Sequence, residues 1–266
     1  MKLASELLEG SHNWVPIRSG ESCDFVYRRD DDLAYAKIAR LARVADLAGE
    51  RDRLSWLNDR GVACPEIIDW REGEEGACLT MTAIPGVPAV DLSGTDLLKA
   101  WPSMAQQLAV LHSLSAVQCP FERRLSRMFG RAVEVVSRNA VNLDFLPDED
   151  KNRPQHELLA RLERELPVRL EQESADTVVC HGDPCMPNFV VDPHSLQCAG
   201  LIDLGRLGTA DRYADLALMI ANAGEIWPAS HEAERAFAVL FDILRITAPD
   251  RERLAFYLRL DPLTWG

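Results

Sequence analysis

The segment from Cys180 to Leu204 constrains the fold of this chain more than any other part of it. Within it, Asn188 to Val191 and Cys198 to Ile202 are short apolar and β-branched runs, separated by an Asp-Pro-His-Ser sequence that favours a turn. The pattern predicts an antiparallel hairpin, in which the start of the first strand and the end of the second lie together. Asn188 and Asp203 are therefore expected to be neighbours.

Oxygen-bearing side chains gather around this predicted hairpin. Asp183 lies in the preceding loop, Asn188 opens the first strand and Asp203 follows the second. Carboxylate and amide oxygens of this kind suit Mg²⁺, which usually completes its shell with substrate phosphates. A further short apolar run, Val178 to Cys180, predicts another strand just before the loop.

The length and charge of the chain limit its function. With 266 residues, it can bury a sizeable core as one large domain or two modest lobes. Its formal net charge is −13, which argues against nucleic acid as a partner because like charges repel. The same charge favours a small cationic partner, although solubility alone would also account for it.

The cysteines and the N-terminus bear on the compartment. Seven cysteines form an odd count without a repeated spacing, which fits a reducing cytoplasm better than a disulfide framework. No C-x-x-C or H-x₃-H pair is present, so a metal–thiolate site is not expected. Residues 1–10 combine acidic residues with short apolar pieces, so neither a signal peptide nor a membrane span is expected there.

Three strands are predicted between Val15 and Ala39. In the last of them, alternation places Tyr35 and Lys37 on one face and Ala36 on the other. A lone lysine on a strand is usually a solvated edge residue, so Lys37 gains a functional interpretation only from the loop downstream.

That loop resembles a known family. His181-Gly182-Asp183-x-x-x-x-Asn188, followed by Ile202-Asp203-Leu204-Gly205, is similar to the catalytic and metal-binding segments of the aminoglycoside phosphotransferase family. In protein kinases the related motifs are H-R-D-x-x-x-x-N and D-F-G. The resemblance implies that Asp183 is the catalytic residue beside the acceptor hydroxyl, and that Asn188 and Asp203 hold Mg²⁺.

The resemblance also assigns residues that bind ATP. Lys37 corresponds to the phosphate-binding lysine, Tyr35 is expected near the adenine, and Glu50 is expected to hold the lysine in place. Gly20 and Ser22 resemble the short phosphate loop of the family, and the backbones of Thr82 and Ile84 are implied to bind the adenine edge. Nucleotide binding is thus expected from Gly20, Ser22, Tyr35, Lys37, Glu50, Thr82 and Ile84.

An Ile-Pro-Gly-Val-Pro sequence that begins at Ile84 predicts a linker. We expect an α+β, bilobal, protein-kinase-like fold, with a β-rich N-terminal nucleotide-binding lobe over residues 1–84 and a mainly helical catalytic and substrate-binding lobe over residues 85–266. Apolar stripes at helical spacing support the second lobe. His112 lies on such a helix and is interpreted as a core or surface residue. Asp211 and Asp215 are expected to cap a helix that opens near Gly208.

The resemblance extends from Trp14 to Trp265 and is strongest to family members that phosphorylate the 3''-hydroxyl of streptomycin and confer antibiotic resistance. It implies a cytoplasmic, ATP- and Mg²⁺-dependent kinase of a small cationic substrate, with a monomer favoured. Kinases of another aminoglycoside, choline or homoserine stay open, as does a non-catalytic nucleotide-binding module. Expected substrate contacts are Asp144, Glu225, Trp227, Tyr257, Asp261 and Trp265.

Overall fold

The computed structural model describes residues 7–8, 13–17, 25–227 and 230–265. The chain forms two compact units. Unit 1 comprises Met1–Asp91 and Asn188–Gly205, and unit 2 comprises Leu92–Pro187 and Arg206–Gly266. The predicted hairpin therefore belongs with the N-terminal strands, while the expected lobe boundary between residues 84 and 85 stays a prediction.

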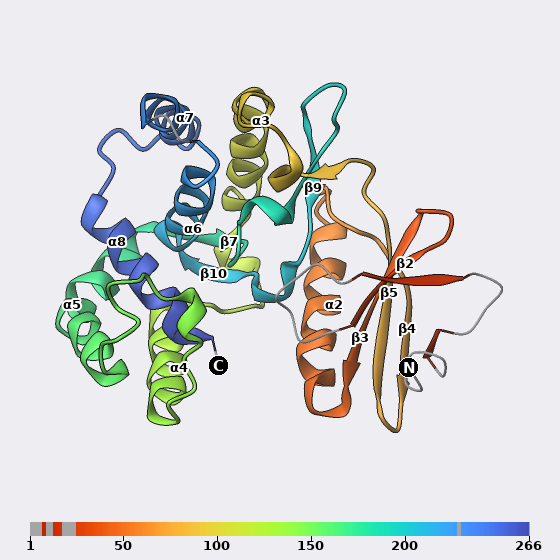
Figure 1. Cartoon of the computed structure of the whole chain (residues 1–266), viewed down its shortest axis with the longest axis horizontal. Coiled ribbons are helices and arrows are strands. Elements are labelled where there is room, and N and C mark those ends of the chain that lie inside the picture. Colours follow the sequence, from red (N-terminus) through yellow and green to blue (C-terminus); the bar gives the residue numbers. More distant parts are fainter. Residues whose placement is uncertain (1–6, 9–12, 18–24, 228–229, 266) are drawn as a thin grey trace. The chain divides into compact units, whose positions relative to one another are not determined.

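Unit 1 is built on an antiparallel sheet of five strands in the order β1-β2-β3-β5-β4 (Figure 1). The three strands predicted from the N-terminal pattern are confirmed as β1, β2 and β3, and a tight hairpin joins β4 to β5 with Gly73 paired to Gly76. The strands are β1 (Trp14–Ile17), β2 (Phe25–Arg29), β3 (Ala34–Arg40), β4 (Ile67–Gly73) and β5 (Gly76–Thr82).

One long helix packs in unit 1. After the short 3₁₀ turn η1 (Leu41–Arg43), α2 (Val44–Asn58) buries Leu47, Leu54 and Leu57, whose spacing places them on one face. Gly61, just beyond the helix, has a φ of 68°, a left-handed conformation that glycine adopts without strain. The predicted helix and its stop are thus both confirmed.

A smaller sheet of three strands, in the order β6-β8-β9, completes unit 1. Its strands β8 and β9 pair antiparallel and form the predicted hairpin. Gly86 allows β6 to join them, because a Cβ at this position would lie 2.6 Å from the carbonyl oxygen of Val191. The elements are β6 (Val87–Pro88), η2 (Ala89–Asp91), η5 (Met186–Asn188), β8 (Phe189–Val191), β9 (Cys198–Leu201) and η6 (Leu204–Arg206).

Unit 2 is mainly helical and includes one two-stranded sheet (Figure 1). The predicted apolar stripe of α3 is confirmed, since Leu97, Trp101, Met104 and Leu108 are at most 1% exposed. Its elements are α3 (Gly94–His112), η3 (Ala116–Gln118), α4 (Leu125–Ser137), η4 (Leu143–Phe145), α5 (Gln155–Asp176), β7 (Thr177–Cys180), β10 (Gly208–Asp211), α6 (Arg212–Gly224), α7 (Ser230–Ile243), α8 (Arg251–Leu260) and η7 (Asp261–Thr264).

The start of α6 differs from the prediction. The helix expected from Gly208 begins at Arg212, because residues Gly208–Asp211 pair with β7 as strand β10. Asp211 is the N-cap, since its side chain accepts a hydrogen bond from the Tyr213 amide at 2.9 Å. The capping role predicted for Asp211 is therefore confirmed. Asp215 lies in the first turn of α6, as expected near the helix start, but it does not cap the helix, because its carboxylate hydrogen-bonds the amides of His181 and Gly182.

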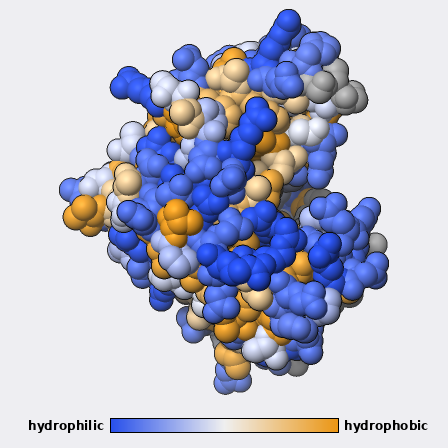
Figure 2. Space-filling model, turned by 90° about the vertical axis from the view of Figure 1, so that its left-hand side faces the viewer, coloured by the Kyte–Doolittle hydropathy of each residue, from blue (hydrophilic) through white to orange (hydrophobic). Residues whose placement is uncertain are grey.

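The surface agrees with the charged composition. Figure 2 shows the side of the molecule that is at the left in Figure 1, where hydrophobic residues form separate patches among hydrophilic ones. Among the described helices, none is long and apolar enough to cross a membrane.

Candidate active site

Lys37 is at the centre of a charged cluster in unit 1. On β3 the side chains of Ala36 and Ile38 are fully buried on one face of the sheet, and alternation directs Lys37 to the other face, as predicted. The Lys37 Nζ donates to Glu50 Oε1 at 2.6 Å and to Asp203 Oδ1 at 2.9 Å. The predicted pairing of Lys37 with Glu50 is thus present.

The cluster keeps its lysine charged. Burial by itself would lower the pKa of Lys37, but the carboxylates of Glu50 and Asp203 raise it well above its ordinary value. Glu50, on α2, is only 6% exposed, whereas the Asp203 side chain is 45% exposed. A fixed cation beside a partly open carboxylate can bind a phosphate and a metal ion together.

Asn188 and Asp203 meet at one end of the β8–β9 hairpin, as the sequence predicted. Phe189 pairs with Leu201, and the amide of Ile202 donates to the carbonyl oxygen of Asn188 at 3.0 Å. Asp203 has a φ of 58°, in the left-handed region that few non-glycine residues adopt, although aspartate is among those found there more often. Uncommon backbone conformations of this kind cluster at functional sites.

Asp183 lies in unit 2, in the turn that follows β7. Its amide donates to His181 Nδ1 at 3.2 Å, so the predicted bracing of the loop by His181 is present. Gly182, with a φ of 88°, cannot be replaced without strain, because a Cβ there would lie 2.3 Å from the carbonyl oxygen of Arg206. Burial raises the pKa of the nearby Cys185 thiol, and the charge and hydrogen bond of the partly buried Asp183 carboxylate raise it further.

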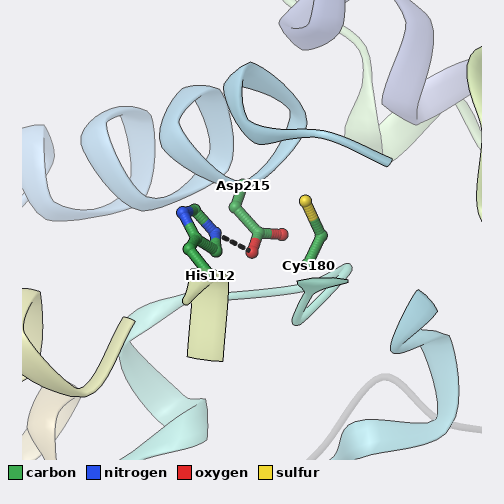
Figure 3. A group of neighbouring side chains, drawn as sticks. All are labelled: His112, Cys180 and Asp215. Atoms are coloured by element: carbon green, nitrogen blue, oxygen red, sulfur yellow. Dashed lines mark hydrogen bonds and ion pairs between the residues drawn. The ribbon is translucent and has the colours of Figure 1, made fainter. Parts of the chain in front are cut away.

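Behind this turn lies a buried group that the sequence analysis did not connect to the loop. Figure 3 shows His112 from α3, Cys180 from β7 and Asp215 from α6, whose ligand atoms all lie within 4.8 Å of one another. The Asp215 carboxylate, however, accepts hydrogen bonds from His112 Nε2 and from the amides of His181 and Gly182. Burial also raises the pKa of the Cys180 thiol well above 9, so this group is a hydrogen-bonded core and not a set of ready metal ligands.

The remaining residues predicted to bind nucleotide are only partly described. Gly20 and Ser22 lie outside the described residues. Tyr35 is half-buried beside Lys37 on the same face of β3. The amide of Thr82 donates to the Glu66 carbonyl oxygen at 2.9 Å, so the Thr82 N–H is not available to an adenine. The backbone amide of Ile84 has no hydrogen-bond acceptor within the described part of the chain.

Two of the aromatic residues predicted to bind substrate are buried. Trp227 is 3% exposed, packs edge-on against Trp101 and donates from Nε1 to the carbonyl oxygen of Gly94 at 3.0 Å. Tyr257 is 1% exposed and donates its hydroxyl to Asp211 at 2.9 Å. Neither ring offers a surface on which a substrate cation could stack, so both predictions are corrected to core positions.

Asp261 and Trp265 take part in a closed ion cluster. The Asp261 Oδ1 is 2.8 Å from Arg206 Nη2 and 3.2 Å from Arg123 Nη2, and Oδ2 accepts from the Trp265 indole at 3.0 Å. The Arg206 guanidinium lies 4.2 Å from the centre of the Trp265 ring. The Trp265 ring, expected to contact substrate, thus makes its cation–π contact with Arg206 of the protein itself, and Asp261 is 8% exposed.

The other two predicted substrate contacts are exposed. Asp144 lies in η4, where its amide donates to Asn142 at 3.1 Å, and Glu225 follows the last turn of α6. Of the acidic residues predicted to bind substrate, these two keep carboxylates that are open to solvent.

Comparisons with known proteins agree with this geometry. Residues 13–257 match the family described as the phosphotransferase enzyme family. A streptomycin 3''-kinase of Streptomyces griseus is 49% identical over 261 residues, which cover 98% of this chain and 96% of that protein. An aminoglycoside 3'-phosphotransferase of Streptomyces fradiae is 36% identical, with 94% of each chain covered.

Solved structures show the same relationship. The aminoglycoside phosphotransferase APH(3'')-Id of Streptomyces rimosus, in complex with ADP and streptomycin, superposes with a TM-score of 0.92 at 45% identity, over 99% of this chain and 96% of that one. The predicted α+β, kinase-like fold is thereby confirmed. The chain belongs to the aminoglycoside phosphotransferase family, within the phosphotransferase enzymes.

Proposed function

We propose that this enzyme transfers the γ-phosphoryl group of ATP to the 3''-hydroxyl of streptomycin and thereby confers resistance to the antibiotic. The observation that carries the proposal is the Lys37–Glu50–Asp203 cluster, with Nζ–O distances of 2.6 and 2.9 Å, at the end of the hairpin that also holds Asn188. The identity to the streptomycin 3''-kinase over nearly the whole chain supports streptomycin as the acceptor.

Each residue has a defined role in this proposal. Lys37, held by Glu50, binds and neutralises the phosphates of ATP, and Asp183 orients the acceptor hydroxyl and takes its proton. The amide of Asn188 and the carboxylate of Asp203 fit Mg²⁺, because both are hard oxygen donors at one end of a hairpin. When bound, Mg²⁺ neutralises charge that develops on the phosphates. Most of the catalysis then comes from positioning and electrostatics.

The adenine is proposed to bind beside Tyr35 and to accept a hydrogen bond from the Ile84 amide, while Gly20 and Ser22 contribute to phosphate binding. The net charge of −13 attracts the guanidinium groups of streptomycin. Asp144 and Glu225 are the proposed acidic contacts, because both are exposed.

We also propose that the protein acts as a monomer in the cytoplasm, with nucleotide bound by residues 1–84 and the acceptor by residues 85–266. The odd number of cysteines supports a reducing compartment.

The test is a panel of acceptors with ATP and Mg²⁺, followed by the position of the phosphate on the product by NMR. We expect streptomycin to be phosphorylated on its 3''-hydroxyl in preference to other aminoglycosides, choline or homoserine. Asp183→Asn tests the catalytic residue. It should lower kcat by about 10² to 10⁴-fold, the range for loss of a general base, while ADP still binds. Preference for another acceptor, or full activity of D183N, would refute the corresponding part of the proposal.

The proposed substrate contacts need a separate measurement. Glu225→Gln and Asp144→Asn should each raise the KM for streptomycin and leave the KM for ATP unchanged, since each removes one exposed carboxylate. Unchanged streptomycin kinetics would remove the residue from the site.

A further inference from the structure

Trp265, the last residue that the structure describes, is held from three sides. Its indole Nε1 donates to Asp261 Oδ2 at 3.0 Å, and the Arg206 guanidinium lies 4.2 Å from the centre of its ring. The Phe145 ring packs against it edge to face, with the ring centres 5.7 Å apart and the planes at 66°. Aromatic pairs prefer this geometry, so Trp265 joins Phe145 to Arg206, two residues that are far apart in the sequence.

The Arg206 side of this arrangement is firmly anchored. Arg206 Nη2 donates to Asp261 Oδ1 at 2.8 Å and to Thr264 Oγ1 at 3.1 Å. The backbone of Arg206 packs closely against Gly182, in the turn that carries the catalytic residue. None of these contacts depends on Trp265, so Arg206 should keep its place when the indole ring is removed.

The Phe145 side is much less secure. The element η4 (Leu143–Phe145) is a single 3₁₀ turn, and its printed hydrogen bonds are local: the Asp144 amide donates to the Asn142 side chain at 3.1 Å, and the Phe145 amide donates to the Asn142 carbonyl oxygen at 3.2 Å. Of the three residues of η4, Leu143 and Asp144 are exposed, and Phe145 is the one whose side chain is partly buried. One such turn has little stability of its own, so η4 depends on the packing of the Phe145 ring.

The packing of Phe145 also sets the direction of its neighbour. Successive side chains of a 3₁₀ helix point about 120° apart, so a Phe145 ring that is packed inward directs the Asp144 carboxylate away from the core. Asp144 is one of the two exposed acidic residues proposed to contact the substrate. A carboxylate that is already held in place loses less conformational freedom when a cation binds to it.

We propose that Trp265 is a positioning residue that holds η4, and with it the Asp144 carboxylate, in the geometry that binds the cationic acceptor, without contact between Trp265 and the acceptor. This inference rests on the proposed function, because Asp144 acts on turnover only if the acceptor is cationic. The effect falls on the KM for streptomycin. The kcat and the KM for ATP should stay nearly unchanged, because Arg206 keeps its bonds to Asp261 and Thr264.

Variants on both sides of the ring contact test the role of Trp265. Trp265→Leu should raise the KM for streptomycin about fivefold, the size expected when one exposed carboxylate contact is lost, with kcat and the KM for ATP within about twofold of wild type. Phe145→Leu removes the same contact but leaves the indole hydrogen bond and the Arg206 contact in place, so it tests the contact even if W265L does not fold. Trp265→Phe keeps an aromatic ring between Phe145 and Arg206 and should recover most of the affinity for streptomycin.

A double variant tests whether Trp265 acts through Asp144. In the W265L background the carboxylate is no longer held in place, so Asp144→Asn should raise the KM for streptomycin by less than about twofold. Effects of W265L and D144N that multiply fully would mean that the two residues act independently, and would overturn the proposal.

Trp227→Leu is the matched control. Like Trp265, Trp227 donates its indole N–H to an oxygen acceptor, the Gly94 carbonyl at 3.0 Å, and packs edge-on against an aromatic ring, that of Trp101 at 5.1 Å. Neither partner lies in η4. All variants are compared at a temperature well below their melting points. W227L should lose stability and keep its KM for streptomycin, whereas W265L and F145L should show the rise in KM even where their melting points are the higher.

Hydrogen–deuterium exchange gives a readout that does not depend on activity. In W265L and F145L, the amides of Phe145 and Leu146, which donate to the Asn142 and Leu143 carbonyl oxygens, should exchange about tenfold faster than in wild type and in W227L. Unchanged exchange of these amides, or a KM for streptomycin that stays at the wild-type value in both W265L and F145L, would overturn the role of Trp265. If exchange rises as expected but wild type phosphorylates no acceptor, Trp265 stands as the support of η4 and the proposed function fails.

Discussion

Asp203 in unit 1 and Asp261 in unit 2 are both bound by cationic side chains, yet their surroundings differ. Asp203 shares one lysine with Glu50, and its side chain is 45% exposed. Asp261 is bound by two arginines and an indole N–H, and its side chain is 12% exposed. One carboxylate thus presents surface to solvent, while the other is enclosed by its own partners.

The difference separates residues that can bind ligands from residues that hold the fold. A partly exposed carboxylate beside a fixed lysine can accept a metal ion with modest loss of hydration. An enclosed carboxylate would have to give up hydrogen bonds that the protein already supplies, at a cost of about 1–3 kcal/mol for each charged contact. The exposed fraction of a carboxylate, taken together with its hydrogen-bond partners, therefore separates ligand-binding acidic residues from structural ones.

The open cluster is formed by Lys37, Glu50 and Asp203, and Lys37→Ala should lower its activity the most. It should lower kcat/KM for ATP by about 10² to 10³-fold, as loss of one fixed charge-stabilising donor usually does. The removal also leaves Glu50, 6% exposed, without its closest cation, so unfolding must be measured alongside. The check is steady-state kinetics at saturating streptomycin, below the melting point of the variant.

Glu50→Gln is the matched control for this cluster. It keeps a hydrogen-bond acceptor near Lys37 Nζ but removes one charge, so we expect a smaller loss than in K37A. Activity of K37A within fivefold of wild type would contradict the phosphate-binding role and weaken the contrast between open and closed clusters.

Asp261→Asn tests the closed cluster through stability. It should lower the free energy of unfolding by about 3 kcal/mol at pH 7, because two arginines lose their shared carboxylate. Burial tends to raise the pKa of Asp261, but Arg206 and Arg123 lower it below its ordinary value. The stabilisation is then full above the unfolded pKa of about 4 and is lost as the pH falls through the folded value.

Urea unfolding of wild type and D261N at pH 7, 5 and 3 measures this dependence. The difference between the two proteins should be constant from pH 7 to 5 and should shrink at pH 3. The KM for streptomycin at pH 7 separates the two interpretations of this residue: a closed cluster predicts little change, whereas the substrate contact expected from the sequence predicts a rise. A large rise in KM without a loss of stability would show that Asp261 faces the substrate.

Local pattern predicted the open cluster well. Strand alternation placed Lys37 on the correct face, and the hairpin spacing brought Asn188 next to Asp203, because both features depend on backbone geometry within short segments. The partner Glu50 came from family resemblance together with a clear helical stripe.

The buried polar pairs of unit 2 could not be predicted in the same way. His112 and Asp215 are 103 positions apart, and Asp261 meets Arg123 across 138 positions, so each pairing is decided by how helices pack and not by local spacing. The tryptophan at Trp227 illustrates the same limit, since an aromatic residue after a helix is equally compatible with a core and with a ligand surface. The sequence identifies such residues as functional candidates, and burial decides among them.

Asp203→Asn should have the smallest effect on stability. Lys37 keeps Glu50 at 2.6 Å, and the lost carboxylate is 45% exposed, so the free energy of unfolding should change by less than about 1 kcal/mol in the absence of nucleotide. Its effect should appear instead in ligand binding: titration with ADP should lose its dependence on Mg²⁺, because the proposed carboxylate ligand is gone. Urea unfolding of D203N beside D261N compares the two carboxylates directly. An equal loss of stability in both would mean that Asp203 is as much a structural residue as Asp261, and that exposure does not separate the binding cluster from the structural one.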